Sequence, residues 1–328
     1  MKAVIVKEPG GLEQLRVVEV PDPSVGRDEV LIDVAFCGLN WADTMIRVGT
    51  YPHPFAYPAI PGLEAAGRIG AIGQDVGNLK VGDRVVGFNE KGGGYAEKFV
   101  VSKDWVILLP AGMPIEVGAA FPVQSLTAYH MLHTVARIDR GDWILVHAIG
   151  GGVGLYCTQL AVKAGAHVIG TVGSPGKDTR ALEYGAERVV LRTTEDFEAV
   201  VLDLTGGNGV DLVIDSLGAR TLDRSFNVVH KLGKVISIGE AEGVPYSNIR
   251  ERLLPRSLTF TRFHIGHVDP TSSVGQQAVR YVMSAILEGW LKVPIAGIYE
   301  FAQAADMQAR IASRQLSGKL LLRVGGRA

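Results

Sequence analysis

Glycines that could take part in phosphate binding are concentrated in one stretch of the sequence. Residues 148–154 read Ala-Ile-Gly-Gly-Gly-Val-Gly, and a short apolar run, residues 143–146, comes directly before them. Such a run is typical of a buried parallel strand, and residues 155–164 then have the character of a helix. A turn without side chains lets a pyrophosphate approach the backbone and the free N–H groups at the start of the helix. The stretch therefore predicts a phosphate site.

The spacing of these glycines supports a dinucleotide site only in combination with its surroundings. Ala148, Gly151 and Gly154 form an Ala-x-x-Gly-x-x-Gly pattern, because Leu155 stands where the strict Gly-x-Gly-x-x-Gly spacing needs its third glycine. A second strand is expected at residues 167–172. It ends about 20 residues after the glycine-rich turn, at the point where an acidic side chain ordinarily holds the adenosine ribose. The strand, the turn, the helix and the second strand together predict dinucleotide binding.

The residues after this second strand predict which nicotinamide dinucleotide binds. No carboxylate occurs there before Asp178, whereas Ser174 offers a hydroxyl and Lys177 a positive charge. A carboxylate would repel a phosphate on the 2′ oxygen of the ribose, and a lysine would pair with it. Arg192, at the end of the third predicted strand, could add a fork of donors. The pattern favours NADPH over NADH; the alternative is that Lys177 and Arg192 are solvated surface cations.

The elements that would position these residues divide the chain into two domains, as its length of 328 residues also suggests. Residues 1–122 contain short β-like runs separated by glycine and proline, which predicts a partly closed β domain. Residues 123–263 alternate strands with helices, which predicts a doubly wound parallel sheet. Residues 264–328 add two helices and a last strand, which we expect to rejoin the first domain.

Short apolar runs indicate the strands, and longer periodic stretches indicate the helices. The predicted strands are residues 3–6, 15–20, 29–37, 67–72, 84–88, 95–101, 167–172, 188–192, 210–216, 233–239, 258–263 and 318–324. The predicted helices are residues 155–164, 177–184, 195–204, 276–287 and 302–314. Residues 52–62 are rich in proline and predict a loop, because each proline removes a backbone donor and restrains its predecessor.

Composition and charge restrict the class of partner. Lysine and arginine number 33 against 34 aspartate and glutamate, so no overall field attracts nucleic acid or anionic lipid. No window reaches the ~18 uninterrupted apolar residues of a membrane span, and residues 1–6 lack a secretory signal pattern. Cys37 and Cys157 stand far apart, which argues against a disulfide framework. We expect a cytoplasmic protein with small-molecule or protein partners, no nucleic acid and no membrane.

Motifs along nearly the whole chain resemble those of one family. The segments that carry the resemblance are residues 37–43 (Cys-Gly-Leu-Asn-Trp-Ala-Asp), 49–52, 61–67 (Pro-Gly-Leu-Glu-Ala-Ala-Gly), 92–97, 126–129, 146–148, 211–218 and 317–319 (Ser-Gly-Lys). As a set they resemble the zinc-free quinone oxidoreductases (zeta-crystallin-like) of the medium-chain dehydrogenase/reductase superfamily.

The resemblance also bears on a catalytic metal. The zinc-dependent alcohol dehydrogenases of that superfamily carry a cysteine where this chain has Asn40 and a histidine where it has Leu63. An amide and an aliphatic side chain cannot replace the thiolate, imidazole or carboxylate ligands of catalytic zinc. Glu64 remains, and a single carboxylate is better explained as a packed or paired acid. We therefore predict no metal site.

The resemblance implies a fold and a set of site residues. It implies a Rossmann dinucleotide-binding domain, residues 123–263, and a mostly β, partly barrel-like (GroES-like) catalytic domain, residues 1–122 and 264–328, with NADPH in the cleft between them. By position, the residues on the acceptor side are Asn40, Asp43 and Tyr51. The residues expected at the cofactor are Thr127, Gly151, Gly152, Val153, Gly173, Ser174, Lys177, Arg192, Ser216, Gly218, Gly239, Phe263, Gly318 and Lys319.

Three positions depart from what is common in the family. Tyrosine is frequent where this chain has Arg192, which changes the geometry of phosphate binding. Alanine is frequent where it has Gly150, so the turn of three successive glycines carries an extra entropy cost on ordering. The acidic loop with Glu240 and Glu242 is unexpected beside a phosphate-bearing cofactor.

Several histidines and a cysteine are better explained by packing than by chemistry. His130 and His133 share a helix face but have no third ligand in sight, so we expect ordinary helix residues. His147 lies inside a predicted strand and is expected to be a hydrogen-bonded core residue. Cys37 is expected to be buried and inert.

These observations predict a zinc-independent NADPH-dependent oxidoreductase that transfers a hydride to a quinone or an α,β-unsaturated carbonyl. Hydride transfer needs close stacking on the nicotinamide and a donor aimed at the acceptor oxygen, and Tyr51 is the candidate proton donor. The predicted edge strand, residues 258–263, suggests a homodimer, because an apolar outer strand must be covered or paired. Two alternatives stay open: an enone, alkenal or acrylyl-thioester reductase, and a non-catalytic NADPH-binding protein.

Overall fold

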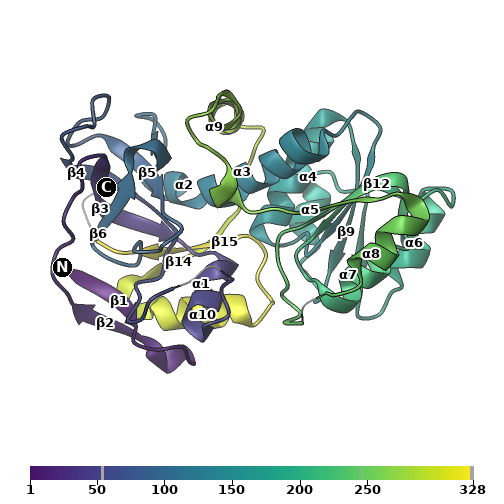
Figure 1. Cartoon of the computed structure of the whole chain (residues 1–328), viewed down its shortest axis with the longest axis horizontal. Helices are drawn as coiled ribbons and strands as arrows, with labels where there is room; N and C mark the ends of the chain where they lie inside the picture. Colours follow the sequence, from purple (N-terminus) through teal and green to yellow (C-terminus); the bar gives the residue numbers. More distant parts are fainter. Residues whose placement is uncertain (53–54, 245, 326–328) are drawn as a thin grey trace. The chain divides into compact units, whose positions relative to one another are not determined.

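Antiparallel and parallel β-sheets occupy different parts of the chain in the computed structural model, which describes residues 1–52, 55–244 and 246–325 (Figure 1). The chain separates into two units. The first comprises Met1–Val123, Asp269–Val279 and Val293–Ala328, and the second comprises Gln124–Val268 and Arg280–Lys292.

A mostly antiparallel sheet forms the first unit. Its strands are β3 (Glu29–Gly38), β4 (Glu64–Ile72), β5 (Arg84–Phe88), β6 (Lys98–Ser102), β7 (Val106–Leu108), β14 (Ile295–Glu300) and β15 (Lys319–Arg323). They lie in the order β14-β15-β3-β4-β5-β7, and β6 also pairs with β3. A separate antiparallel pair is formed by β1 (Lys2–Val6) and β2 (Leu15–Glu19). This arrangement confirms the expected β domain.

The helices of the first unit pack on this sheet or beside it. They are α1 (Trp41–Val48), α2 (Ile115–Ala120) and α10 (Ala304–Ala312), with short 3₁₀ turns at Leu12–Gln14, Lys103–Trp105 and Phe301–Gln303. α2 packs on β3, β4 and β15, and α10 contacts β15 and α1. Between α1 and β4 the proline-rich segment forms no helix or strand in its described residues, as predicted.

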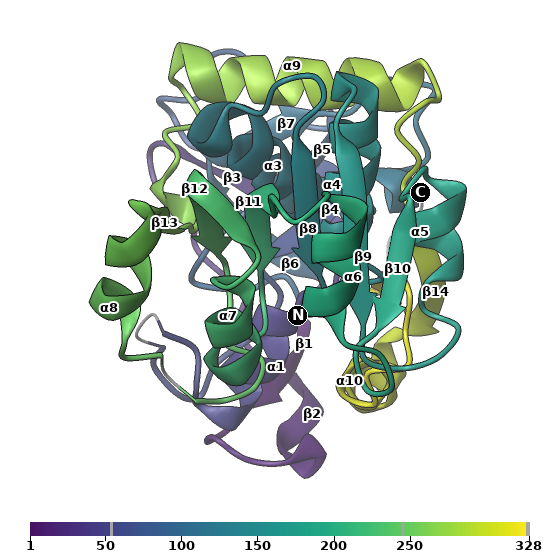
Figure 2. The same ribbon diagram turned by 90° about the vertical axis from the view of Figure 1, so that its right-hand side faces the viewer.

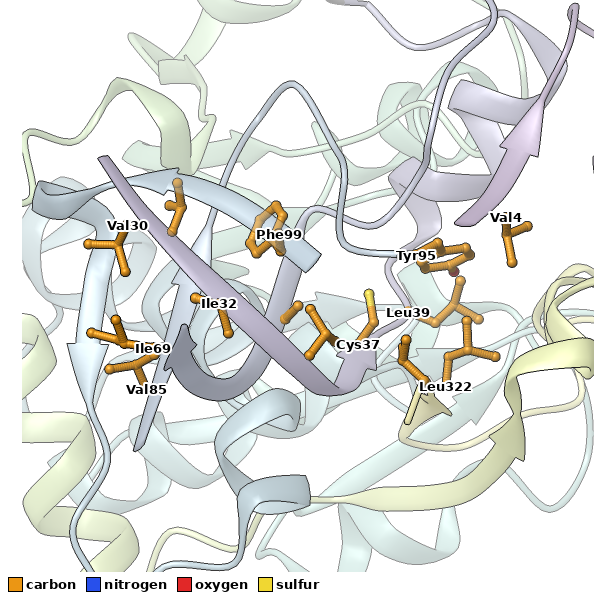
Figure 3. Packing of buried hydrophobic residues seen from close by; sticks show 14 of the residues in the cluster. Val4, Val30, Ile32, Cys37, Leu39, Ile69, Val85, Tyr95, Phe99 and Leu322 are labelled. Atoms are coloured by element: carbon orange, nitrogen blue, oxygen red, sulfur yellow. The ribbon is translucent and has the colours of Figure 1, made fainter. Parts of the chain in front are cut away.

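The core of the first unit is made by alternate side chains of its strands. Long strand β3 contributes Val30, Ile32 and Val34, all buried, while Asp33 between them is exposed. Figure 3 shows Phe99 of β6 and Tyr95 close to the same core. The strand expected at residues 95–101 begins later, at Lys98, because the backbone of Tyr95 hydrogen-bonds to Pro61 and Val4 instead.

The C-terminal strand rejoins the first unit as predicted. β15 pairs antiparallel with β3, with Leu322 opposite Cys37. Its other neighbour, β14, was not predicted. β14 is parallel to β15, lies at the edge of the sheet and contains Gly297, and its side chains are half-buried or exposed, so it lacks the apolar run of an interior strand.

Six parallel strands form the sheet of the second unit. They are β8 (Trp143–His147), β9 (His167–Val172), β10 (Arg188–Leu191), β11 (Val210–Asp215), β12 (Val229–Ser237) and β13 (Thr259–Arg262). Their order is β10-β9-β8-β11-β12-β13. Every pair in it is parallel, and the predicted doubly wound sheet is confirmed.

Helices cover both faces of the parallel sheet. They are α3 (Pro122–Tyr129), a π-helical segment (His130–Ala136), α4 (Gly152–Ala164), α5 (Thr179–Glu183), α6 (Phe197–Leu204), α7 (Ala219–Ser225) and α8 (Ile249–Leu253), with 3₁₀ turns at Leu254–Arg256 and Ile265–His267. α4 and α5 lie on one face and α6 and α7 on the other (Figures 1 and 2). No helix within the described residues is both long and apolar enough to cross a bilayer.

The units differ in two ways from the expected domain boundaries. The second unit runs to Val268 rather than to residue 263, and it includes residues 280–292. Those residues complete α9 (Ser273–Leu287) and a following turn, where Gln159 of α4 binds both backbone groups of Lys292, at 3.1 Å and 2.6 Å. This pair of hydrogen bonds attaches the segment to the second unit, and no local sequence signal predicts it.

Candidate functional site

The glycine-rich turn of the second unit leads from β8 into α4. Ala148 adopts a left-handed conformation with φ of 52°, and the Gly151 N–H donates to its carbonyl at 2.8 Å. α4 then begins at Gly152, three residues earlier than predicted, with Gly151 as its N-cap. No side chain among the described residues caps this helix. The turn therefore presents an uncapped helix N-terminus, which favours an anion.

Two glycines of this turn lie in close contact with their neighbours, but only Gly154, which meets backbone atoms rather than the end of a flexible side chain, is required by packing. A methyl group at Gly152 would lie 1.8 Å from Oε1 of Gln124, and one at Gly154 would lie 2.6 Å from Cα of Ile149. Both distances are far below ordinary van der Waals contact. The absence of side chains at these positions brings α3 and the preceding turn against the start of α4.

The loop after β9 contains the residues expected at the adenosine phosphate. Ser174 and Lys177 are half-buried in this loop. The guanidinium of Arg192 lies against Gly173, where a methyl group would be 2.7 Å from one of its terminal nitrogens. β9 and β10 are parallel neighbours, so the residues that follow them meet at the same sheet edge. The structure thus brings Arg192 to the loop with Ser174 and Lys177.

The other expected cofactor residues of the second unit follow strands at this edge. Ser216 and Gly218 follow β11, and a methyl group at Gly239, after β12, would lie 3.0 Å from the Ser216 carbonyl. Phe263 directly follows β13, and its N–H donates to Ser237 at 2.9 Å. These residues lie beyond the carboxyl ends of adjacent parallel strands, where ligands of such sheets bind.

Asp215 is a buried residue at this edge that the sequence reasoning did not single out. Its carboxylate accepts hydrogen bonds from the Leu217 and Gly218 N–H groups, at 3.3 Å and 3.0 Å, and so holds the turn after β11. Burial raises the pKa of Asp215 to about 7, against the opposing effect of these two hydrogen bonds. An aspartate two residues before a Leu-Gly pair is the local signal of such a turn.

The acidic residues Glu240 and Glu242, in the loop after β12, have polar partners within the second unit. Glu242 accepts from the Arg220 N–H at 3.0 Å and from the Thr221 hydroxyl, in the first turn of α7. Glu240 lies 3.9 Å from the guanidinium of Arg262. The loop therefore caps a helix and approaches a cation within its own unit.

Thr127 is buried on α3. Of the two histidines in the π-helical segment that follows, His130 is buried and His133 is half-buried. Nδ1 of His130 lies 2.9 Å from the Thr134 hydroxyl, and burial lowers the pKa of His130 to about 4. His147 is buried between the Thr171 and Ser225 hydroxyls, at 2.9 Å and 2.8 Å. Burial lowers its pKa to about 3. The prediction of a hydrogen-bonded core histidine at 147 is confirmed.

In the first unit, Asp43 organises the start of α1. Its two carboxylate oxygens accept from the backbone N–H groups of Asn40, at 2.8 Å, and Gly62, at 2.9 Å. The side chain is fully buried, and burial raises its pKa to about 7 although both hydrogen bonds oppose the shift. Asp43 thus ties the backbone before α1 to the backbone before β4, and its carboxylate is not exposed to solvent.

Asn40, which follows β3, belongs to a buried cluster with Glu64 at the start of β4 and Lys319 at the start of β15. The Lys319 ammonium donates to Asn40 Oδ1 at 2.8 Å and forms an ion pair with Glu64. Asn40 Nδ2 donates to Glu64 Oε1 at 2.9 Å, and the Val123 N–H donates to Glu64 Oε2 at 2.9 Å. The side chains of Lys319 and Glu64 are both 0% exposed. The prediction that Glu64 is a paired acid is confirmed.

The cluster also fixes the orientation of the Asn40 amide. An ammonium can only donate and a carboxylate can only accept, so Oδ1 must face Lys319 and Nδ2 must face Glu64. Lys319, expected at the cofactor, directs its ammonium into this cluster, and Gly318 before it is buried with φ of 103°. Lys319 and Glu64 are both distant from Asn40 in sequence, whereas its capping-box partner Asp43 is three residues away.

Tyr51 lies just after α1, with its ring edge-on to Phe55 at a centroid distance of 5.9 Å. Burial, followed by the charges of Asp43 and Glu90, raises the pKa of Tyr51 to about 12. Its hydroxyl therefore stays protonated at neutral pH. Residues 53–54 of the neighbouring proline-rich loop lie outside the described residues.

Side chains that bind metals are not grouped in the described residues. No set of three or more histidine, cysteine, aspartate or glutamate side chains there could hold a metal ion. Leu63 is buried next to the paired Glu64. Cys37 donates from Sγ to the Glu64 carbonyl at 3.0 Å, and burial raises the pKa of its thiol well above the usual range, which makes it a packing residue.

Comparison with known proteins identifies the class. Residues 26–111 match the family described as Alcohol dehydrogenase GroES-like domain, and residues 152–284 match the family described as Zinc-binding dehydrogenase. A GroES-like domain followed by a Rossmann-type parallel sheet defines a medium-chain dehydrogenase/reductase.

Individual relatives narrow the class. A probable quinone oxidoreductase of Schizosaccharomyces pombe is 34% identical over 315 residues, which cover 96% of this chain and 94% of that protein. Escherichia coli quinone oxidoreductase complexed with NADPH has a TM-score of 0.94 at 32% identity, with 98% of this chain and 100% of that chain covered. A 2-haloacrylate reductase of a Burkholderia species is 29% identical over 327 residues, covering 98% of each. The chain belongs to the quinone oxidoreductase family of medium-chain dehydrogenases/reductases, and is an oxidoreductase of that type.

Proposed function

We propose that this protein is a zinc-independent, NADPH-dependent oxidoreductase that reduces a quinone or an α,β-unsaturated carbonyl. The observation that carries the proposal is the position of the Arg192 guanidinium against Gly173, in the loop that also holds Ser174 and Lys177. No carboxylate occurs in this loop before Asp178. Cations and a hydroxyl at the end of the second strand suit a ribose 2′-phosphate.

The residues of the second unit fit the remainder of the cofactor. The uncapped start of α4, with Gly151, Gly152 and Val153, would bind the pyrophosphate through backbone N–H groups. Other proposed contacts are Thr127, Ser216, Gly218, Gly239 and Phe263. From the first unit we propose contact with the segment of Gly318 and Lys319, through its backbone, because the Lys319 ammonium is bound to Asn40 and Glu64.

When bound, NADPH supplies the hydride, and the first unit must orient the acceptor and provide a proton. We propose that the Asn40 amide, whose orientation Lys319 and Glu64 fix, orients the acceptor oxygen. Asp43 would hold the backbone beneath it through its two hydrogen bonds. Tyr51, which is protonated at neutral pH, would deliver the proton from its hydroxyl to the acceptor oxygen as charge develops there. No step requires a metal.

The cofactor assignment is tested by the affinities of a Lys177→Ala variant for NADPH and NADH, measured by fluorescence titration. Loss of the cation should weaken NADPH binding by about tenfold or more and leave NADH within about twofold. Lys163→Ala is the matched control, because Lys163 lies over the Trp290 ring at 5.0 Å, at the other end of α4. Equal weakening of both cofactors by Lys177→Ala would contradict the assignment.

A panel of acceptors tests the reaction itself. Purified protein with NADPH is offered a benzoquinone, an enone, an alkenal and an acrylyl thioester, with and without a chelator. Activity with a quinone or an enone that survives the chelator supports the proposal. The similarity to a 2-haloacrylate reductase favours the acrylyl compounds as the second candidate class. Tight NADPH binding without oxidation by any acceptor would point to a non-catalytic binding protein.

We also propose a cytoplasmic homodimer that pairs through β13. This strand is at the edge of the parallel sheet and is only partly buried in the single chain. An outer strand with free backbone groups is stabilised by pairing with a second copy. Sedimentation velocity would give the mass of a dimer, and a monomer at micromolar concentration would contradict this part of the proposal.

A further inference from the structure

Gln308 joins helix α10 to helix α1 of the same unit, and Figure 1 shows the two helices side by side. The Gln308 side chain is 0% exposed. Its Oε1 accepts a hydrogen bond from Nε of Arg47 at 2.8 Å, and its Nε2 donates to the Asp43 carbonyl at 3.3 Å. A guanidinium can only donate and a carbonyl can only accept, so these two partners also fix the orientation of the Gln308 amide.

These two hydrogen bonds hold α1 at two points, one helical turn apart. Asp43 and Arg47 are four residues apart and therefore lie on the same face of the helix. Hydrophobic contact is non-directional and lets a short helix slide or rotate, whereas hydrogen bonds weaken steeply when their angle changes. Because α1 has only eight residues, its position depends on such contacts with the rest of the unit.

Arg47 extends this attachment to the C-terminal end of α1. Its guanidinium donates to the Gly10 carbonyl at 2.6 Å, and the Gly10 N–H donates to the Arg47 carbonyl at 2.9 Å. Arg47 is buried, with 7% of its surface exposed. The end of the helix is thereby held between Gln308 and the turn that follows β1.

The residues of the proposed acceptor site lie at the two ends of α1. Asn40 is its N-cap, and the Asp43 carboxylate holds the Asn40 N–H. At the other end, the Thr50 N–H donates to the Met45 carbonyl at 2.9 Å, and Tyr51 comes next. A helix of eight residues is about 12 Å long, so a shift or tilt of α1 displaces both ends together. A displacement of about 1 Å is enough to lose much of an oriented interaction.

We propose that Gln308 is a positioning residue for reduction of the acceptor: by binding α1 at Asp43 and Arg47, it sets where Asn40 and Tyr51 stand. This inference rests on the proposed function, in which Asn40 orients the acceptor oxygen and Tyr51 delivers the proton. Gln308 acts through α1, although it is 265 residues from Asp43 in the sequence.

A Gln308→Met variant tests the proposal, because it keeps the length of the side chain and removes both hydrogen bonds. We measure kcat with a benzoquinone or an enone, whichever the wild type reduces faster, and the affinity for NADPH by fluorescence titration. The value of kcat should fall at least about tenfold, because the acceptor is misplaced. NADPH affinity should stay within about twofold, because the proposed cofactor contacts lie mainly in the second unit.

The adjacent residue of α10 supplies a matched control for a merely structural effect. Met307 is 0% exposed and belongs to the apolar core of the first unit. Met307→Ala should lower the melting temperature by leaving a cavity, and keep kcat within about twofold. Unchanged kcat in Gln308→Met, or an equal loss of kcat in Met307→Ala, would overturn the inference.

A double variant shows whether Gln308 acts through the site residues. Once Tyr51→Phe has removed the hydroxyl, its placement no longer matters, so Gln308→Met should then cause a smaller further loss of kcat than in the wild type. Losses that multiply in full would count against the inference. If the wild type reduces no acceptor, the proposed function fails and this inference with it. If Tyr51→Phe lowers kcat and Gln308→Met does not, only this inference fails.

A second variant keeps the test decisive should Gln308→Met not fold. Arg47→Lys keeps the positive charge but replaces the forked donors of the guanidinium with a single ammonium. One ammonium cannot occupy the positions of both Nε, which binds Gln308, and the terminal nitrogen that binds Gly10. We expect the same loss of kcat with NADPH affinity kept, and a wild-type kcat in this variant would contradict the proposal.

Discussion

The buried ion pair between Lys319 and Glu64 allows a quantitative test of what holds the first unit together. Both side chains are 0% exposed, and Asn40 and the Val123 N–H complete the hydrogen bonds of the cluster. Lys319→Met removes the ammonium and keeps a side chain of similar length. It leaves the Glu64 carboxylate buried with only the two uncharged donors that the cluster contains.

The expected loss in the free energy of unfolding follows from the complete burial of both side chains. Removing one partner of a fully buried pair destabilises a protein by about 3–5 kcal/mol, because the remaining charge is uncompensated. For a unit of this size such a loss lowers the melting temperature by roughly 6–20 °C. A Lys319→Met/Glu64→Gln double variant removes both charges and should be less destabilised than Lys319→Met alone.

Differential scanning calorimetry and urea unfolding measure the effect, and the chain supplies a matched control. Lys98 in the same unit pairs with Asp22 at 3.6 Å and Asp33 at 3.4 Å, but its side chain is 33% exposed. Lys98→Met should cost at most about 1 kcal/mol, because exposed pairs contribute little. The reasoning is refuted if Lys319→Met costs no more than Lys98→Met, or if the double variant loses as much stability as the two single variants combined.

Two further predictions concern ionisable groups. The His147 pKa of about 3 is depressed by burial from an unfolded value near 6.5, so the unfolded state binds more protons and stability falls as pH drops from about 6.5 towards 3. His147→Gln should show a smaller decrease in its urea midpoint between pH 7 and pH 5 than the wild type. Tyr51→Phe should lower turnover while NADPH affinity is kept; unchanged turnover would exclude Tyr51 as the proton donor.

Much of the fold was predictable because periodic patterns and glycines mark it locally. The predicted bounds of β5 and β9 match the structure residue for residue. The whole parallel sheet was found from apolar runs that alternate with helical stretches. α1 was missed although Asn40 and Asp43 have the spacing of a capping box, which is a recognisable helix start. α7 and α8 have seven and five residues, too short for a clear period.

The site was predictable only where its residues follow the order of the strands. Lys177 lies in the loop after β9 and Arg192 directly follows β10, its parallel neighbour, so their convergence could be inferred from the sequence. The Lys319–Glu64 pair joins residues 255 apart, and only the pairing of β15 with β3 and of β3 with β4 brings them together. The contact of Gln308 with Asp43 was equally hidden, because a hydrogen bond between residues 265 apart has no local signature.

The acidic loop with Glu240 and Glu242 stabilises a helix of its own unit, which explains negative charge close to the proposed cofactor site. Glu242 accepts from the Arg220 N–H and the Thr221 hydroxyl, so its carboxylate stabilises the N-terminus of α7. Glu242→Gln should therefore cost about 0.5–1 kcal/mol in urea unfolding. Glu240→Gln is the control and should cost less, since Glu240 is 41% exposed and 3.9 Å from Arg262. If Glu242→Gln instead leaves stability unchanged and tightens NADPH binding, the loop acts by repelling the cofactor and the capping role is wrong.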